Sequence, residues 1–104
     1  MVVWTDTSIS HITDFINEAK NGSEQTAKKY MKKLIDYADT LEAMPNLGKE
    51  FPIFLNNYNL KQLMYKKHRI IYYIKDKNVV ILAVLHTKLD IKKAIKSIKN
   101  WKEQ

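Results

Sequence analysis

The sequence predicts an α+β domain in which an N-terminal helical hairpin packs on a small, mainly antiparallel sheet, followed by a short C-terminal helix. Apolar residues recur at three- and four-residue spacing between positions 9 and 44, which is typical of amphipathic helices. Between positions 60 and 90 this spacing gives way to runs of β-branched and aromatic residues, which are typical of buried strands. A chain of 104 residues has room for one modest core, so residues 1–104 are predicted to form a single domain.

The chain opens with a short β-prone run, residues 2–5, which we expect to add an N-terminal strand to the sheet. A first helix follows, and its candidate N-caps are Asp6, Thr7 and Ser8. Its apolar face comprises Ile9, Ile12, Phe15, Ile16 and Ala19. The helix ends at Asn21 and Gly22, because glycine readily adopts the left-handed conformation past a helix C-terminus. His11 lies off the apolar face and is interpreted as a surface residue without a role.

A second, longer helix is predicted from the N-cap Ser23 to Pro45, which stops it. Its apolar face comprises Ala27, Tyr30, Met31, Leu34, Ala38, Leu41 and Met44. Because only a few residues connect the two helices, they must lie antiparallel, and their joint apolar face needs the sheet to cover it.

The segment from Pro45 to Asn59 has no sustained periodicity and contains the turn residues Gly48 and Pro52. We predict a loop of about fifteen residues here, and loops of this length in a small domain are usually functional or mobile. Lys49 and Glu50 lie in this loop, directly before the sheet.

Three successive strands are predicted between Leu60 and Asp90. The second and third, residues 69–74 and 79–85, are separated by the polar residues 75–78 and should form an antiparallel hairpin. That pairing would bring Arg69 and His86 to the same end of the sheet. After the sheet, a short amphipathic helix is predicted from Ile91, Ala94, Ile95 and Ile98, with lysines on its other faces.

The net charge of +7 is unevenly divided along the chain. Residues 1–60 carry six lysines against eight acids, whereas residues 61–104 carry twelve basic residues against three acids. A basic half built around a sheet favours phosphates or an acidic protein as partner, although a solvated lysine surface would look the same. The absence of cysteine, and of any apolar run near the roughly 18 residues of a membrane span, predicts a cytoplasmic protein with no membrane partner.

Six residues are candidates for chemistry, and together they fit cleavage of RNA by its own 2′-hydroxyl without a metal. Glu50 or His86 would handle protons, and Arg69, the only arginine, would hold the phosphate through its planar guanidinium. Lys49, Lys61 and Lys88 would add positive charge. The histidines lie in separate elements and only two glycines are present, so we expect neither a metal site nor a cofactor. Alternatively, Arg69 and His86 are strand-end residues satisfied by solvent.

The order of the motifs is that of a known family. A strand and a helical hairpin precede a Pro45-x-x-Gly48-Lys49 turn, then Leu60-Lys61-Gln62-Leu63, His68-Arg69-Ile70-Ile71-Tyr72 and Ile81-Leu82-Ala83-Val84-Leu85-His86-Thr87-Lys88-Leu89-Asp90. Over essentially its whole length the chain resembles the RelE/ParE superfamily of type II toxin–antitoxin toxins. The resemblance implies a curved antiparallel sheet under two helices, a cognate antitoxin that wraps the toxin, and growth arrest when the toxin is free.

The family divides by target, because RelE-like members cut mRNA on the ribosome and ParE-like members inhibit DNA gyrase. By resemblance, Arg69 matches a central-strand arginine, Glu50 a glutamate after the Gly-Lys turn, and His86 a histidine at the exit of the last strand. Two departures weaken this match: Lys88-Leu89-Asp90 stands where Arg-Arg-Asp is usual, and Lys61 replaces an arginine. Because Glu50, Arg69 and His86 together offer proton transfer and phosphate binding, we expect ribosome-dependent mRNA cleavage by a metal-independent endoribonuclease. The alternatives are gyrase inhibition and a basic binding module whose toxicity has decayed. Neither alternative requires catalysis, so it stays open whether the protein is an enzyme.

Overall fold

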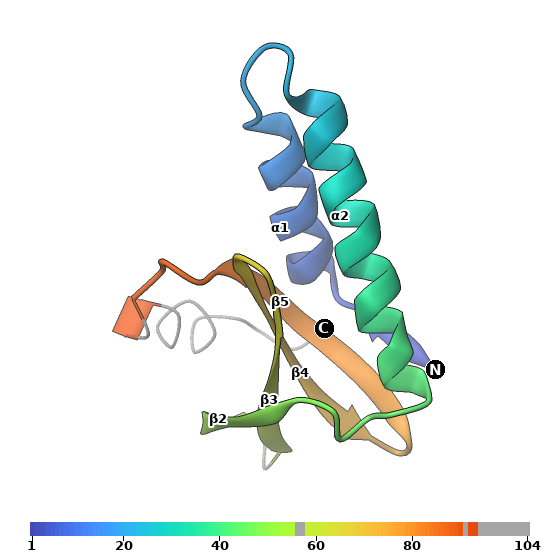
Figure 1. Ribbon diagram of the computed structural model, residues 1–104. Helices are drawn as coiled ribbons and strands as arrows, with labels where there is room; N and C mark the ends of the chain where they lie inside the picture. The colour runs from blue at the N-terminus through green and yellow to red at the C-terminus, as the bar shows by residue number, and fades with distance from the viewer. Residues whose placement is uncertain (56–57, 91, 94–104) are drawn as a thin grey trace.

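The computed structural model describes residues 1–55, 58–90 and 92–93, and it confirms the predicted α+β fold. The elements in chain order are β1 (Val2–Trp4), α1 (Asp6–Asn17), α2 (Glu24–Asp39), the short 3₁₀ helix η1 (Thr40–Glu42), β2 (Lys49–Leu55), β3 (Tyr58–Tyr65), β4 (His68–Lys75) and β5 (Asn78–His86). In Figure 1 the helices α1 and α2 lie side by side on one face of the sheet, with their connecting turn at the end farthest from it. The predicted C-terminal helix begins at residue 91 and lies, apart from residues 92–93, outside the described residues.

The five strands form one sheet in the order β1-β5-β4-β3-β2. The β2–β3, β3–β4 and β4–β5 pairs are antiparallel and only β1 runs parallel to its neighbour β5, so the sheet is mainly antiparallel, as predicted. The β4–β5 turn closes on the pair Lys75 and Asn78, with Asp76 and Lys77 both at positive φ. Such a two-residue turn matches the twist of the strands, which explains why the polar break was recognisable in the sequence.

Each face of the sheet carries its own apolar cluster. On the face that α1 and α2 cover, here called the helix face, the buried residues are Met31, Leu34, Ala38, Leu41, Leu63, Ile70, Tyr72, Val79, Ile81 and Val84. On the opposite face they are Phe51, Leu60, Ile71, Tyr73, Leu82, Ala83 and Leu85. Burial on both faces explains why the β4 and β5 sequences read as nearly continuous apolar runs.

The predicted loop between Pro45 and Asn59 was wrong, because residues Lys49–Leu55 form strand β2. Two features hid this strand from the sequence. It contains Pro52, which is tolerated because β2 lies at an edge of the sheet. Its pairing with β3 also shifts register between Glu50 and Phe54, which breaks the alternation expected of a strand.

The first helix is capped by Thr5, one residue before the predicted candidates. The Thr5 side chain accepts a hydrogen bond from the Ser8 amide at 3.2 Å and donates one to the Ile81 carbonyl of β5 at 2.8 Å. Thr5 therefore ends β1, begins α1 and fastens both to the sheet. At the start of α2, Ser23 occupies the predicted N-cap position, but its hydroxyl donates to the Lys20 carbonyl instead of capping the helix.

His11 is not the surface residue without a role that the sequence suggested. Its Nδ1 accepts a hydrogen bond from the Val84 amide at 3.1 Å, and burial lowers its pKa. Pairing between β1 and β5 stops at Trp4 and Ile81, so the edge of β5 beyond that point would otherwise leave this amide unpaired. The His11 side chain of α1 therefore supplies the hydrogen-bond acceptor that β1 is too short to provide.

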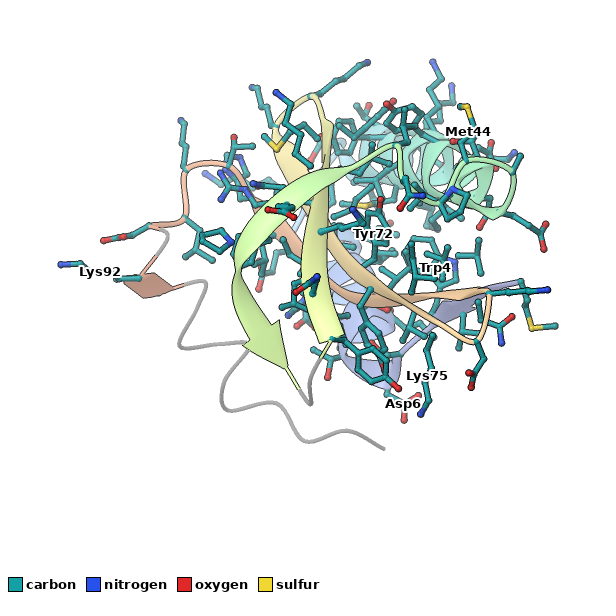
Figure 2. All side chains as sticks on the ribbon, turned by 90° about the horizontal axis from the view of Figure 1, so that it is seen from below. Trp4, Asp6, Met44, Tyr72, Lys75 and Lys92 are labelled. Atoms are coloured by element: carbon teal, nitrogen blue, oxygen red, sulfur yellow. The ribbon has the colours of Figure 1, made fainter. Side chains whose placement is uncertain are left out.

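The turn before β2 is fastened to the centre of the sheet by Tyr72. Its ring is fully buried, and its hydroxyl donates to the Pro45 carbonyl at 2.8 Å and accepts from the Gly48 amide at 2.9 Å. Figure 2 shows Tyr72 near the middle of the molecule. Burial raises the pKa of this hydroxyl, which therefore stays protonated and able to donate.

Candidate functional site

Four rings gather on the helix face where β4 begins and β5 ends. His68 and His86 are directly paired across the two strands, and their ring centroids lie 5.2 Å apart. Phe15 of α1 meets His68 edge-on at 5.1 Å, and Tyr30 of α2 lies 5.3 Å from the same imidazole. Both helices of the hairpin are therefore joined to the sheet at this point.

Tyr30 and His68 share the shortest side-chain contact of the cluster, 2.7 Å between the tyrosine hydroxyl and Nδ1. The Lys67 amide donates to the same hydroxyl, whose own proton has two acceptors within reach, His68 Nδ1 at 2.7 Å and the Tyr65 carbonyl at 3.5 Å. The shorter contact assigns the proton to the imidazole. His68 consequently accepts at Nδ1 and carries its own proton on Nε2. This arrangement links α2 to the β3–β4 turn through one part-buried hydrogen-bond chain.

His68 is only 5% exposed and is neutral at physiological pH. Burial is the main cause, and the neighbouring His86 adds to it; together they lower the pKa of His68 to about 4. At His86, Nδ1 accepts a hydrogen bond from the Lys88 amide at 3.0 Å, so the proton of its neutral form is also on Nε2. The site thus presents two imidazole N–H donors.

A pocket of about 410 Å³ opens beside this cluster. It is lined by Phe15, Thr26, Ala27, Tyr30, Lys66, Lys67, His68 and His86. Rings and aliphatic groups form most of the wall, and the two lysines belong to the β3–β4 turn. A volume of this size is sufficient for one large side chain or a small ligand.

The predicted proximity of Arg69 and His86 is confirmed only for the backbone. Arg69 is paired with Leu85, the residue before His86, so both lie at the same end of the sheet. Neighbouring residues of a strand point to opposite faces, however. Because His86 contacts His68 on the helix face, Arg69 leaves the sheet on the opposite face. There its Nε is buried without a hydrogen-bond partner among the described residues.

Glu50 and Lys61 lie opposite each other on β2 and β3, in the row of the sheet that also contains Tyr72. His86 pairs with His68, which lies four residues from Tyr72 along β4. In the sheet, β5 is also the third strand from β2, which carries Glu50. With about 3.4 Å per residue and 4.8 Å per strand, Glu50 and His86 are separated by roughly 20 Å along the sheet. Glu50 and His86, the two candidates for proton transfer, therefore do not share one site.

The remaining two candidates are also separated from each other. Lys49 is exposed and pairs with Gln62, in a row whose β4 member, Ile71, belongs to the opposite face. Lys88 is exposed in the turn after β5, where its amide orients His86. Thus, of the six predicted residues, His86 and Lys88 contact each other after β5, and Glu50 and Lys61 face each other across β2 and β3.

Sequence reasoning missed Tyr30, His68, Lys66 and Lys67. Tyr30 was assigned to the core, where its ring does pack, and His68 was considered only as the first residue of a family motif. The one available signal was the position of Lys66 and Lys67 between two strands, which marks a tight turn. Among residues 1–55, 58–90 and 92–93, no group of three or more His, Cys, Asp or Glu side chains gathers as metal ligands. In the same part of the chain, no helix is long and apolar enough to cross a membrane.

A comparison with models of protein families identifies the family of this chain. The profile described as the ParE toxin of the type II toxin–antitoxin system parDE matches residues 2–91. This chain belongs to the ParE toxin family. It is accordingly a toxin component of a type II toxin–antitoxin system, and its partner is a cognate antitoxin.

Solved structures agree with this family at the level of the fold. A chain of the chromosomal ParDE toxin–antitoxin system from P. aeruginosa superimposes with a TM-score of 0.66 at 15% sequence identity. The match covers 84% of this toxin and 95% of the P. aeruginosa chain. A comparison of the sequence with curated proteins gives no match.

Proposed function

We propose that this ParE-family toxin arrests growth by inhibiting DNA gyrase. The observation that carries the proposal is the separation of Arg69 from Glu50 and His86. A metal-free ribonuclease needs its proton-transferring groups and its phosphate-binding cation around one phosphate. Here the arginine leaves the opposite face of the sheet, whereas Glu50 and His86 belong to rows of the helix face.

Hydrogen-bond distances favour gyrase inhibition over mRNA cleavage. A general acid or base acts at about 3 Å from the atom it protonates, directly or through one water. The roughly 20 Å between the Glu50 and His86 positions exceeds the combined reach of both side chains around a single phosphate. Membership of the ParE family adds to this argument, since ParE-like inhibition of gyrase needs a protein-binding surface and no such catalytic group.

Cleavage of mRNA is the second candidate, and one observation favours it. His86 borders the pocket that also contains Lys66, Lys67 and the neutral His68, so a proton donor and two cations share one cavity. In that case Arg69, Glu50, Lys49 and Lys61 would have no part in the chemistry. His86 and Lys88 would then be the only predicted residues at the reacting site.

The Arg69→Ala variant separates the two targets when it is induced in growing cells without antitoxin. We expect it to arrest growth as the unaltered toxin does, with incorporation of labelled thymidine falling before that of labelled methionine. Arg69→Lys, which keeps the charge, is the matched control, and circular dichroism of both purified variants checks their folding. The gyrase proposal would be contradicted if the Arg69→Ala variant were folded but harmless and if cells expressing the unaltered toxin lost translation first.

A further inference from the structure

We propose that the pocket beside Tyr30 and His68 binds a nucleoside 5′-monophosphate, with its base among the rings and its phosphate at the imidazole and lysine groups. We call this pocket, which is lined by the eight residues named above, the ring pocket. The inference goes beyond gyrase inhibition and does not depend on it, because it concerns a small ligand that the proposed target does not require.

The polar groups of the ring pocket select an anion. The described residues that line it include two lysines and two histidines but no acid. Both imidazoles accept a hydrogen bond at Nδ1, so each keeps its proton on Nε2 and can donate it to a ligand oxygen. Within the described ranges, neither Lys66 nor Lys67 forms an ion pair with a carboxylate. Their ammonium groups can therefore neutralise a bound anion.

The number of these groups fits a phosphate monoester better than a phosphodiester. A monoester carries a charge of about −1.5 to −2 at pH 7 and three terminal oxygens, which match two ammonium groups and two N–H donors. Each phosphodiester of a nucleic acid carries a single negative charge, so it would neutralise only one of the two lysines. The ring pocket therefore favours a terminal phosphate over the backbone of a nucleic acid.

The wall of the ring pocket suits an aromatic base. Phe15, Tyr30 and His86 are each part-exposed, and with Ala27 they make most of the wall apolar. Aromatic rings attract further rings in offset or edge-on contacts, and every nucleobase has a flat face. The volume of about 410 Å³ lies within the range of roughly 300–1,000 Å³ that is usual for small-ligand pockets. A base and its phosphate can therefore share this cavity.

The β3–β4 turn places a lysine where the backbone disfavours one. Lys66 has a φ of 48°, a left-handed conformation for which two-residue turns ordinarily use glycine, asparagine or aspartate. The turn is held in place because the Lys67 amide donates to the Tyr30 hydroxyl and the Lys67 carbonyl accepts from the Thr87 amide at 2.8 Å. Strained backbone that surrounding contacts maintain is typical of ligand sites. Here it keeps an ammonium group at the pocket, with Lys66 Nζ 5.6 Å from the centre of the Tyr65 ring.

Isothermal titration calorimetry of the full-length toxin with adenosine 5′-monophosphate tests the inference. The comparison ligands are inorganic phosphate, adenosine, and a deoxyadenosine dinucleotide whose only phosphate is a diester. We expect the monophosphate to bind at least tenfold more tightly than each of these three. In ring-nitrogen NMR spectra, it should also shift the Nε2 signals of His68 and His86.

Three results of this titration would overturn the inference. The first is no binding of the monophosphate. The second is equal affinity for inorganic phosphate, because the ring pocket would then be a general anion site. The third is equal affinity for the dinucleotide, because the ligand would then be a nucleic-acid backbone.

Lys66→Gly separates ligand binding from folding. We expect it to weaken binding of the monophosphate at least tenfold while raising the Tm of the toxin, because glycine adopts a positive φ without strain. Lys77→Gly in the β4–β5 turn is the matched control, since Lys77 is also exposed and has a φ of 69°. It should raise the Tm in the same way and change the affinity less than twofold.

Unchanged affinity of Lys66→Gly, or equal losses of affinity in the two glycine variants, would also contradict the inference. None of these readouts involves gyrase, so failure here leaves the proposed target untouched.

Discussion

Gly48→Ala is expected to lower the free energy of unfolding by about 2 to 3 kcal/mol, the upper part of the range for forcing atoms into a packed core. A Cβ at this position would lie 2.6 Å from the Tyr72 hydroxyl oxygen, 2.7 Å from its Cε1 and 2.8 Å from the Gln62 carbonyl oxygen. The Tyr72 ring is fully buried and its hydroxyl is held from both sides, so it has no free direction in which to move. Urea denaturation of the purified toxin measures the change.

Gly22→Ala is the matched control for this substitution. Gly22 adopts a positive φ of 86° but has no atom within 4 Å of the added Cβ. Its replacement should therefore cost only about 1 kcal/mol, from backbone strain alone. A Gly48→Ala variant no less stable than Gly22→Ala would show that Tyr72 does not fix the turn before β2.

Acid is expected to destabilise the toxin through His68, by up to about 3 kcal/mol between pH 7 and pH 4. Burial and His86 lower the pKa of His68 to about 4 in the folded state, whereas the unfolded chain has the ordinary value of 6.5. Over this interval the unfolded state binds the proton more tightly. The stabilisation is therefore complete above pH 6.5, is lost as the pH falls, and changes no further below pH 4.

The groups around His68 define the control for this pH dependence. The Tyr30 hydroxyl of α2 donates to Nδ1, His86 lies opposite on β5, and Lys66 and Lys67 border the same pocket. All the charged groups among them are cationic and oppose protonation of His68. His68→Gln should flatten most of the decline measured by thermal unfolding at each pH, leaving the smaller part due to His11, whose pKa burial also lowers. An unchanged slope would mean that His68 is not buried as described.

Much of the fold could be predicted because local and tertiary signals agree. The helical period and the polar turn at residues 75–78 predicted both helices and the β4–β5 hairpin, although α1 ends at Asn17 and α2 at Asp39, before the predicted ends at Gly22 and Pro45. Strand β2 could not be predicted, because Pro52 and a register shift remove its pattern. Thr5 and His11 were misread for another reason: both fasten α1 to β5, and such long-range hydrogen bonds leave no trace in sequence spacing.

The candidate site was less predictable than the fold. Turn geometry correctly brought Arg69 and His86 to one end of the sheet, but their alternation in neighbouring rows sends them to opposite faces. The Tyr30–His68 contact joins residues 38 positions apart and depends on how the hairpin leans on the sheet. Only a three-dimensional arrangement reveals it, since a tyrosine on a helical apolar face is ordinarily a core residue.

Supercoiling of relaxed plasmid by purified DNA gyrase, with increasing toxin and with toxin first bound to its antitoxin, tests the proposed target most directly. The account predicts that free toxin abolishes supercoiling near stoichiometric ratios and that the antitoxin restores it. The account would be contradicted if gyrase supercoiled the plasmid undiminished in the presence of a toxin preparation that cuts mRNA on translating ribosomes. The toxin would then be an mRNA-cleaving enzyme.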